Sequence, residues 1–169
     1  MEDKRYIPEL LCPAGDKEAL YAAIAGGADA VYFGTDMFNA RIRAGNFTLD
    51  EAREAIKLCH VHGVKAYITL NIAIHERELD TVLQYVGSLY ESGADALIVS
   101  DLGVMSLISQ HFPNFEIHAS TQCTVHNLDG VGFLFLKGCT RADVARERER
   151  EKLDYICKNS EAETEMFLH

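Results

Sequence analysis

The sequence has little of the composition that marks unfolded, fibrous or membrane proteins. It contains only 3 prolines and 12 glycines among 169 residues, which excludes a collagen-like or low-complexity chain. No apolar run approaches the ~20 residues that a membrane-spanning helix needs. The charged opening residues are not followed by an apolar stretch, so we expect no secretory signal, no membrane association and a cytoplasmic protein.

An excess of positive charge is also missing. The formal net charge is −10, whereas a dedicated nucleic-acid-binding module usually carries a basic face. This charge still permits an enzyme that handles RNA through a local patch. Hydrophobic residues make up 48% of the chain, which is enough for the core of one domain or of most of a larger one.

Closely spaced cysteines are absent as well. The five cysteines, Cys12, Cys59, Cys123, Cys139 and Cys157, form no C-x-x-C pair, so we predict free thiols and no metal site. Segment 59–62, Cys-His-Val-His, has residue types that bind metals. It lies at the end of a predicted helix, where residues two apart do not face each other, so we do not expect it to bind a metal. The sequence also lacks a serine nucleophile elbow, an H-E-x-x-H motif, a P-loop and a G-x-G-x-x-G motif.

What the sequence does contain is a repeated unit of an amphipathic stretch, a glycine and a short apolar run. Gly27, Gly63 and Gly93 each follow a helical stretch, where glycine can adopt the left-handed cap conformation. The runs after them are nearly continuously apolar, as in parallel strands buried on both faces. Strands are predicted around residues 9–12, 29–33, 65–70, 95–99, 116–119, 141–145 and 164–168.

Helices are predicted between these strands from apolar spacing and from capping residues. Asp16 is a candidate N-cap of a helix that reaches Ala25, and Thr48 with Glu51 fits a capping box at the start of the next. The remaining helical stretches cover residues 75–91, 102–111, 125–137 and 148–159.

Strands that alternate with helices build a parallel sheet with right-handed crossovers. About seven strands and six helices fit a doubly wound sheet or a TIM-type barrel, and a closed barrel needs eight strands and ~250 residues. We predict an α/β, TIM-barrel-like parallel barrel that is incomplete, with residues 1–169 as the amino-terminal part of a larger domain. The open edge of such a barrel offers a route to self-association.

Polar side chains follow almost every predicted strand. Because ligands bind at the carboxyl ends of strands in parallel α/β folds, we expect these side chains to meet at one mouth. The predicted catalytic residues are Asn71, Asp101, His118, Arg146 and Glu147. The predicted substrate-binding residues are Glu9, Arg43, Asn46, Ser120 and Gln122.

Several of these residues also have a structural interpretation. Asn71 and Asp101 can cap the helices that follow them, Ser120 can belong to a turn, and His118 can be a core histidine with satisfied hydrogen bonds. The Arg146 guanidinium suits a carboxylate or phosphate ligand, and Glu147 can instead form an internal ion pair with Arg146 or with Arg43. The functional interpretation depends on polar side chains following nearly every predicted strand, and not on any single residue.

Seven segments, in order along nearly the whole chain, resemble characteristic motifs of peptidase family U32, the collagenase-like proteases. They are residues 8–16, 26–34, 43–47, 63–71, 95–103, 117–122 and 145–147. The sequence departs from the family pattern at Asp143, where an apolar residue is usual. A buried carboxylate is costly unless it is paired or at an edge, so we expect one of these for Asp143.

The resemblance implies that the parent protein is an enzyme, by the family name a peptidase, with its site at the carboxyl ends of the barrel strands. An alternative within the family is iron–sulfur-dependent hydroxylation of tRNA, ribosomal RNA or a small molecule, and a third is a non-catalytic binding half-barrel. The resemblance therefore leaves a peptide or an RNA as substrate.

In relatives that hydroxylate, cysteines downstream of a segment like 165–169 hold the iron–sulfur cluster, which needs about four thiolates. The resemblance implies a cluster only in a longer protein. For residues 1–169 alone we expect no cofactor and little or no catalysis.

Overall fold

The computed structural model describes residues 7–40, 46–145 and 149–168. Strands and helices alternate along these residues. The strands are β1 (Leu11–Pro13), β2 (Ala30–Gly34), β3 (Lys65–Leu70), β4 (Ala96–Val99), β5 (Glu116–Ala119), β6 (Arg141–Asp143) and β7 (Glu163–Glu165). The α-helices are α1 (Lys17–Ala25), α2 (Leu49–Val61), α3 (Leu79–Glu91), α4 (Leu102–His111), α5 (Leu128–Leu136) and α6 (Arg150–Asn159).

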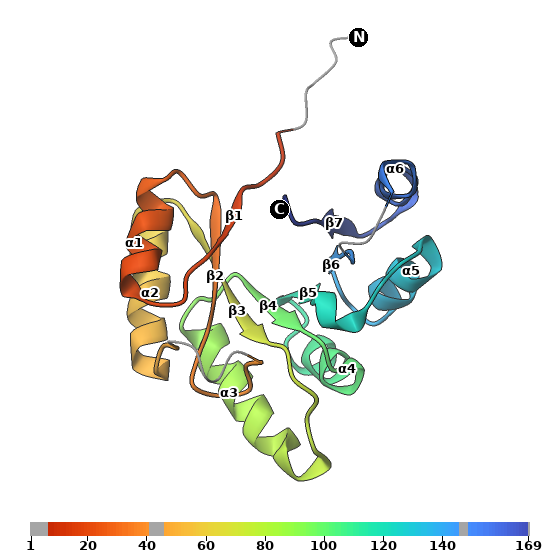
Figure 1. Ribbon diagram of the computed structural model, residues 1–169. Coiled ribbons are helices and arrows are strands. Elements are labelled where there is room, and N and C mark those ends of the chain that lie inside the picture. Colours follow the sequence, from red (N-terminus) through yellow and green to blue (C-terminus); the bar gives the residue numbers. More distant parts are fainter. Residues whose placement is uncertain (1–6, 41–45, 146–148, 169) are drawn as a thin grey trace.

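All seven strands of the described residues run parallel and pair in chain order, from β1 to β7. The sheet curls, and the helices lie along its outer side (Figure 1). This α/β half-barrel confirms the predicted fold class. The outermost strands, β1 and β7, are not paired with each other within the described ranges, so self-association through an open edge stays a prediction.

Side chains alternate between the two faces of this sheet with the period of two that a strand imposes. The outward side chains, such as Val31, Ile68 and Leu97, are buried against the helices in the larger hydrophobic core. The inward side chains of β2 to β4 form a second, smaller cluster, which consists of Ala30, Tyr67, Ala96 and Ile98 with Leu11 and Tyr32 packed against it. The strands therefore separate a helix-covered core from a barrel interior.

Local signals in the sequence set the helix starts. The Asp16 side chain accepts a hydrogen bond from the Ala19 N–H at 2.8 Å, and Thr48 and Glu51 form the predicted capping box. Asn127 caps α5 through the Gly130 N–H at 2.8 Å, so this helix begins at residue 128 and not at 125. The predicted helix 75–91 divides into a 3₁₀ turn (Glu76–Glu78) and α3.

The last two strands are shorter than predicted. β6 ends at Asp143 where the prediction reached residue 145, and β7 covers Glu163–Glu165 where the prediction was 164–168. Their inward side chains are polar and alternate with small outward residues, which is unlike the continuous apolar runs of β2 to β4. In the described parts of the chain, no helix has the length and hydropathy that a membrane-spanning helix requires.

Charged side chains fill the barrel interior near the amino ends of the strands. Arg141, on β6, donates to Glu9 Oε1 at 2.7 Å and to Glu163 Oε2 at 2.8 and 3.0 Å. Glu9 also accepts from Lys65 Nζ at 2.9 Å and from the Tyr67 hydroxyl at 2.8 Å. Since Glu9 precedes β1 and Glu163 lies on β7, Arg141 bridges the two edges of the sheet through side chains.

This network shifts the ionisation of Glu9. Burial by itself raises the pKa of a carboxyl group, but the hydrogen bonds from Arg141, Lys65 and Tyr67 outweigh it and hold the pKa of Glu9 at about 2. The carboxylate is therefore ionised at neutral pH and needs its cationic partners.

We expect acid to remove the contribution of Glu9 to stability. Because its pKa falls from 4.5 to about 2 on folding, the stabilisation is complete above pH 4.5 and is lost as the pH falls toward 2. Glu9→Gln should lower the free energy of unfolding by about 1–3 kcal/mol at neutral pH and weaken this acid dependence. Urea unfolding across the pH range measures both, with exposed Glu91→Gln as the control. Identical pH profiles for Glu9→Gln and the unchanged chain would contradict the prediction.

Candidate functional site

A cavity of about 220 Å³ opens at the carboxyl ends of the strands, on the rim where parallel α/β folds bind ligands. Its polar lining comes from Asn39, Asn46, Thr69, Asn71, Ser120, Thr121, Gln122, Asp143 and Glu165. Tyr32 and Phe167 add aromatic rings, and Ile98 an apolar contact. The cavity thus combines hydrogen-bonding groups with apolar surface, as small-molecule sites do.

One wall of the cavity is built by β2, β3 and the residues after β2. Thr69 Oγ1 lies 3.3 Å from Asn39 Oδ1, and Asn39 Nδ2 donates to Asn46 Oδ1 at 2.6 Å. Asn39 is 4% exposed and packs directly over Gly34, where a Cβ would overlap its amide group. Glycine is required at this position by the close approach of a side chain.

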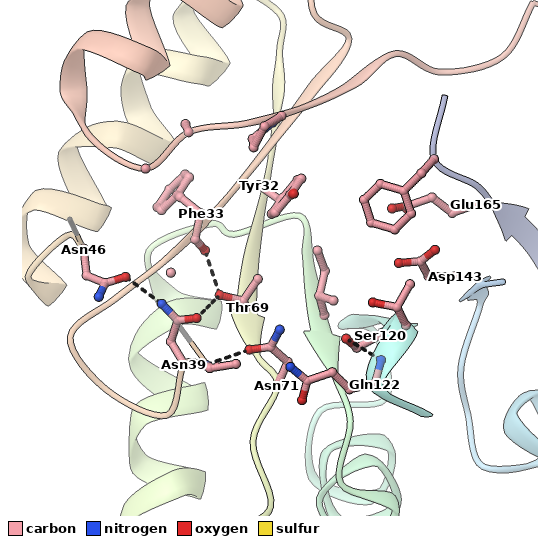
Figure 2. A pocket seen from close by; sticks show the side chains of 18 residues that line it. Tyr32, Phe33, Asn39, Asn46, Thr69, Asn71, Ser120, Gln122, Asp143 and Glu165 are labelled. Atoms are coloured by element: carbon pink, nitrogen blue, oxygen red, sulfur yellow. Dashed lines mark hydrogen bonds between the residues drawn. The ribbon is translucent and has the colours of Figure 1, made fainter. Parts of the chain in front are cut away.

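Asn71 lies directly after β3 and has a fixed amide orientation. Its Oδ1 accepts a hydrogen bond from the Ala40 N–H at 3.1 Å, so its Nδ2 is the group left to donate. Figure 2 shows Asn71 between Asn39 and Gln122, at the edge of the cavity.

The other wall carries two carboxyl groups. Asp143 on β6 and Glu165 on β7 are partners in the strand register, and both line the cavity. Figure 2 shows them opposite Asn39, Thr69 and Asn71. Asp143 is 8% exposed.

Glu165 connects this wall with the ionic network below it. Its Oε2 lies 3.7 Å from Arg141 Nη1. Burial raises the pKa of Glu165, and the neighbouring Arg141 opposes that rise. Arg141 therefore interacts with a carboxyl group of the cavity lining as well as with Glu9 and Glu163 near the amino ends of the strands.

Four of the predicted site residues meet at the cavity. Asn46, Asn71, Ser120 and Gln122 line it, although they come from segments that are far apart in the sequence. The turn interpretation of Ser120 also holds, because its Oγ accepts from the Gln122 N–H at 3.3 Å. Asn71 does not cap a helix but binds the backbone of residue 40.

Asp101 lies beside a neighbouring, more open hollow that shares Gln122 with the cavity. Both of its carboxylate oxygens already accept hydrogen bonds, Oδ1 from Gly103 and Val104 at 2.9 and 3.0 Å and Oδ2 from Ile74 at 3.1 Å. The capping interpretation of Asp101 is therefore confirmed.

His118 and Glu9 do not reach the cavity, which corrects the expectation that all these side chains meet at one mouth. His118 points into the barrel on β5, one inward position before Ser120, and is 2% exposed. Its ring packs edge-on against Tyr67 at 4.7 Å between centroids, and its Nε2 lies 3.5 Å from Glu116 Oε2. Burial lowers the pKa of His118, which keeps the imidazole neutral at neutral pH.

Glu9 lies at the opposite end of the barrel, in the Arg141 network. The predicted residues Arg43, Arg146 and Glu147 lie outside the described residues.

The sequence places Asn39 in the polar loop after the second strand and so at the mouth, but it does not identify Thr69, Asp143 and Glu165 as lining residues. Thr69 could have been found by counting back two residues from Asn71, because inward side chains recur at every second position. The sequence marks Asp143 only as a costly carboxylate in a strand, and it places Glu165 in the last strand without indicating a role.

The described cysteines do not fit an iron–sulfur cluster. No group of three or more His, Cys, Asp or Glu side chains gathers in metal-binding geometry within the described ranges. Burial raises the pKa of Cys59 and Cys123 to about 11 and that of Cys139 to about 12, so these groups stay protonated thiols.

Comparison with known proteins places this architecture in a family. The family model for peptidase family U32 matches residues 15–169. The chain is 38% identical over 161 residues to the 23S rRNA 5-hydroxycytidine C2501 synthase of Escherichia coli, across 95% of this chain and 24% of that protein. It is 37% identical over 163 residues to tRNA hydroxylation protein P of Escherichia coli, across 96% of this chain and 36% of that protein.

A collagenase of Porphyromonas gingivalis is 31% identical over 173 residues, across 95% of this chain and 41% of that protein. The chain thus spans less than half the length of these three relatives.

Solved structures agree on the fold. The U32 peptidase Mk0906 superposes with a TM-score of 0.75 at 10% identity, over 98% of this chain and 70% of that one. A phosphoenolpyruvate phosphomutase from Streptomyces platensis subsp. rosaceus has a TM-score of 0.65 at 11% identity, over 95% of this chain and 68% of that one. At these identities the similarity establishes the barrel architecture alone.

We expect Gly34→Ala to disturb the wall that Asn39 forms. The new Cβ would overlap the Asn39 amide and lie 2.9 Å from Thr69 Oγ1, so the free energy of unfolding should fall by about 1–3 kcal/mol. Gly15→Ala is the matched control, because Gly15 also lines the cavity but a Cβ there meets nothing within 4 Å. Urea unfolding of both variants measures the difference, and equal stabilities would show that the contact is unimportant.

Proposed function

Since the chain belongs to peptidase family U32, we propose that it is the base-binding part of a protein that hydroxylates RNA. The observation that carries this proposal is the cavity at the strand ends, with oriented amides, hydroxyls and carboxyls around it and aromatic rings beside them. The relatives named for rRNA and tRNA hydroxylation support it, with 38% and 37% identity.

A nucleobase matches the chemistry of this cavity. A base presents hydrogen-bond donors and acceptors on its edges and an apolar face that stacks on aromatic side chains. Tyr32 and Phe167 supply rings for stacking, and Asn71, Ser120 and Gln122 supply groups for the edges. Because the cavity is recessed at the barrel mouth, the base must leave its stack in the RNA to enter it.

The role that we assign to these residues is to bind and orient the base and to exclude water from it. Asn71 suits this role because its amide orientation is fixed by the backbone of residue 40. A preorganised group needs no rearrangement when substrate binds, so more of its binding energy is available for positioning. No redox step is assigned to the described cysteines, since their geometry and protonation do not suit a cluster.

Peptide hydrolysis, the first expectation from the family name, has less support. Cys123 is a nucleophile candidate near the mouth, but burial raises its pKa to about 11, and His118 does not line the cavity. In the part of the chain that the structure describes, the cavity lining contains no pair of a cysteine or serine nucleophile with a histidine base. Because a collagenase is 31% identical to this chain, peptide hydrolysis is the alternative that the experiment must distinguish from our proposal.

RNA from a strain that lacks the full-length gene should lose a hydroxylated nucleoside in tRNA or rRNA, as measured by mass spectrometry. The unchanged gene should restore it, whereas Asn71→Ala should lower its level by about tenfold or more, because the base loses a positioned hydrogen bond. Asn159→Ala, an exposed asparagine at the end of α6, is the control and should restore it fully.

An unchanged nucleoside profile in the deletion strain would contradict the proposal. Cleavage of collagen peptides by the purified full-length protein, together with unchanged RNA, would establish the peptidase function in its place.

A further inference from the structure

Helix α5 exposes apolar side chains on the side that faces away from the sheet. Val131 and Leu134 are buried in the larger hydrophobic core, whereas Phe133 and Leu136 are 48% and 83% exposed. Figure 1 shows α5 on the outer side of the barrel. Single exposed apolar side chains are common on protein surfaces, but several on one helix face are typical of a contact with another protein.

The exposed side chains of α5 form a continuous row. Asp129, Gly132, Phe133 and Leu136 are exposed and are spaced i, i+3, i+4 and i+7, which places them on one face of a helix. A Cβ at Gly132 would meet nothing within 4 Å, so no described residue requires glycine there. Glycine inside a helix costs stability. A second helix that approached this face closely would occupy the space that Gly132 leaves.

The charges at the two ends of this row have opposite signs. Asp129 lies in the first turn of α5, Lys137 is its C-cap residue, and Phe133 lies midway between them. Neither charge forms an ion pair with another described residue, and Lys137 Nζ lies 5.6 Å from the centre of the Phe133 ring. Two copies of α5 that pack antiparallel about a two-fold axis near Phe133 therefore bring Asp129 of each copy close to Lys137 of the other.

From this arrangement we infer that the outer face of α5 is a dimer interface, on which a second copy of this chain packs with its own α5 antiparallel to the first. Phe133 and Leu136 form the apolar centre of this interface. Asp129 and Lys137 fix the relative direction of the two helices. The formal net charge of −10 opposes association through most of the surface, whereas this row carries one charge of each sign.

The dimer is expected to be weak. A helix of nine residues offers less area than the ~800 Å² that each partner contributes to a stable interface. The two copies should therefore separate on dilution into the micromolar range. The surface is also distinct from the open edge of the sheet, because α5 packs beside β6 and not beyond β1 or β7.

Sedimentation velocity of the purified chain, from micromolar to millimolar concentration, tests the inference. We expect the measured mass to rise from that of one chain toward that of two. Leu136→Ser should weaken the dimer by about tenfold or more, because the two-fold axis removes its apolar contact twice. Val61→Ser, at the end of α2, is the matched control: Val61 is 82% exposed, and this variant should dimerise like the unchanged chain.

Charge reversal tests the direction of the two helices. Asp129→Lys places two lysines together at each end of the pair, and Lys137→Asp places two aspartates there. At low ionic strength each variant alone should dimerise about tenfold or more weakly than the unchanged chain. An equimolar mixture of the two variants has opposite charges at both ends, so mixing should restore the dimer.

A chain that stays monomeric up to millimolar concentration would overturn the inference. Dimers that survive Leu136→Ser and both charge variants would also overturn it, and would indicate association through another surface such as the open edge. The thermal unfolding midpoint of each variant shows whether it has folded. If both charge variants keep the midpoint of the unchanged chain and their mixture forms no dimer, the antiparallel arrangement is wrong.

Discussion

The parallel pairing of consecutive strands is the constraint on which the rest of the structure depends. Each strand joins the next in register, so all seven described strands end at the same rim. The side-chain period of two then decides which residues point inward. Asn71 and Ser120 reach the cavity because they continue the inward series of β3 and β5 beyond the strand ends. A shift of one residue in β3 or β5 would turn the corresponding side chain toward the helices.

The barrel interior is divided along its length into an ionic half and a hydrogen-bonding half. Near the amino ends, Arg141 is held by Glu9 and Glu163, and these side chains join the edges of the sheet without backbone pairing. Near the carboxyl ends, amides and hydroxyls surround a cavity. Glu165 lines the cavity and lies 3.7 Å from Arg141. The guanidinium that joins the sheet edges therefore also opposes the burial-induced rise in the pKa of Glu165.

Much of the fold was predictable from the sequence because its signals are local. Helix ends are marked by the Thr48–Glu51 capping box and by Gly27, Gly63 and Gly93, which follow α1, α2 and α3. These signals act through the local backbone and do not depend on the tertiary structure. The ends of β6 and β7 were less predictable, because their alternation of charged and small residues gives no continuous apolar run. Their lengths depend on pairing with neighbouring strands, which only the three-dimensional structure fixes.

The candidate site was predictable where a polar residue directly follows a strand, as with Asn71, Ser120 and Gln122. His118 lies inside β5, one inward position before Ser120, so it points into the barrel below the cavity even though the predicted end of this strand, residue 119, is correct. Asp143 shows the opposite case. The sequence identifies it as a costly carboxylate in a buried strand, and the structure places it in the lining of the cavity.

The segment after β2 explains why the wall opposite Asp143 is preorganised. Residues 35–47 contain no helix among those described, and long connections of this kind commonly carry function. Its two ends are fixed: Thr35 hydrogen-bonds the Tyr85 hydroxyl at 2.6 Å, and Phe47 packs on Phe33 with 4.8 Å between ring centroids. Asn39 is held between these anchors. A ligand that enters the cavity therefore meets a wall whose hydrogen-bonding direction is already set.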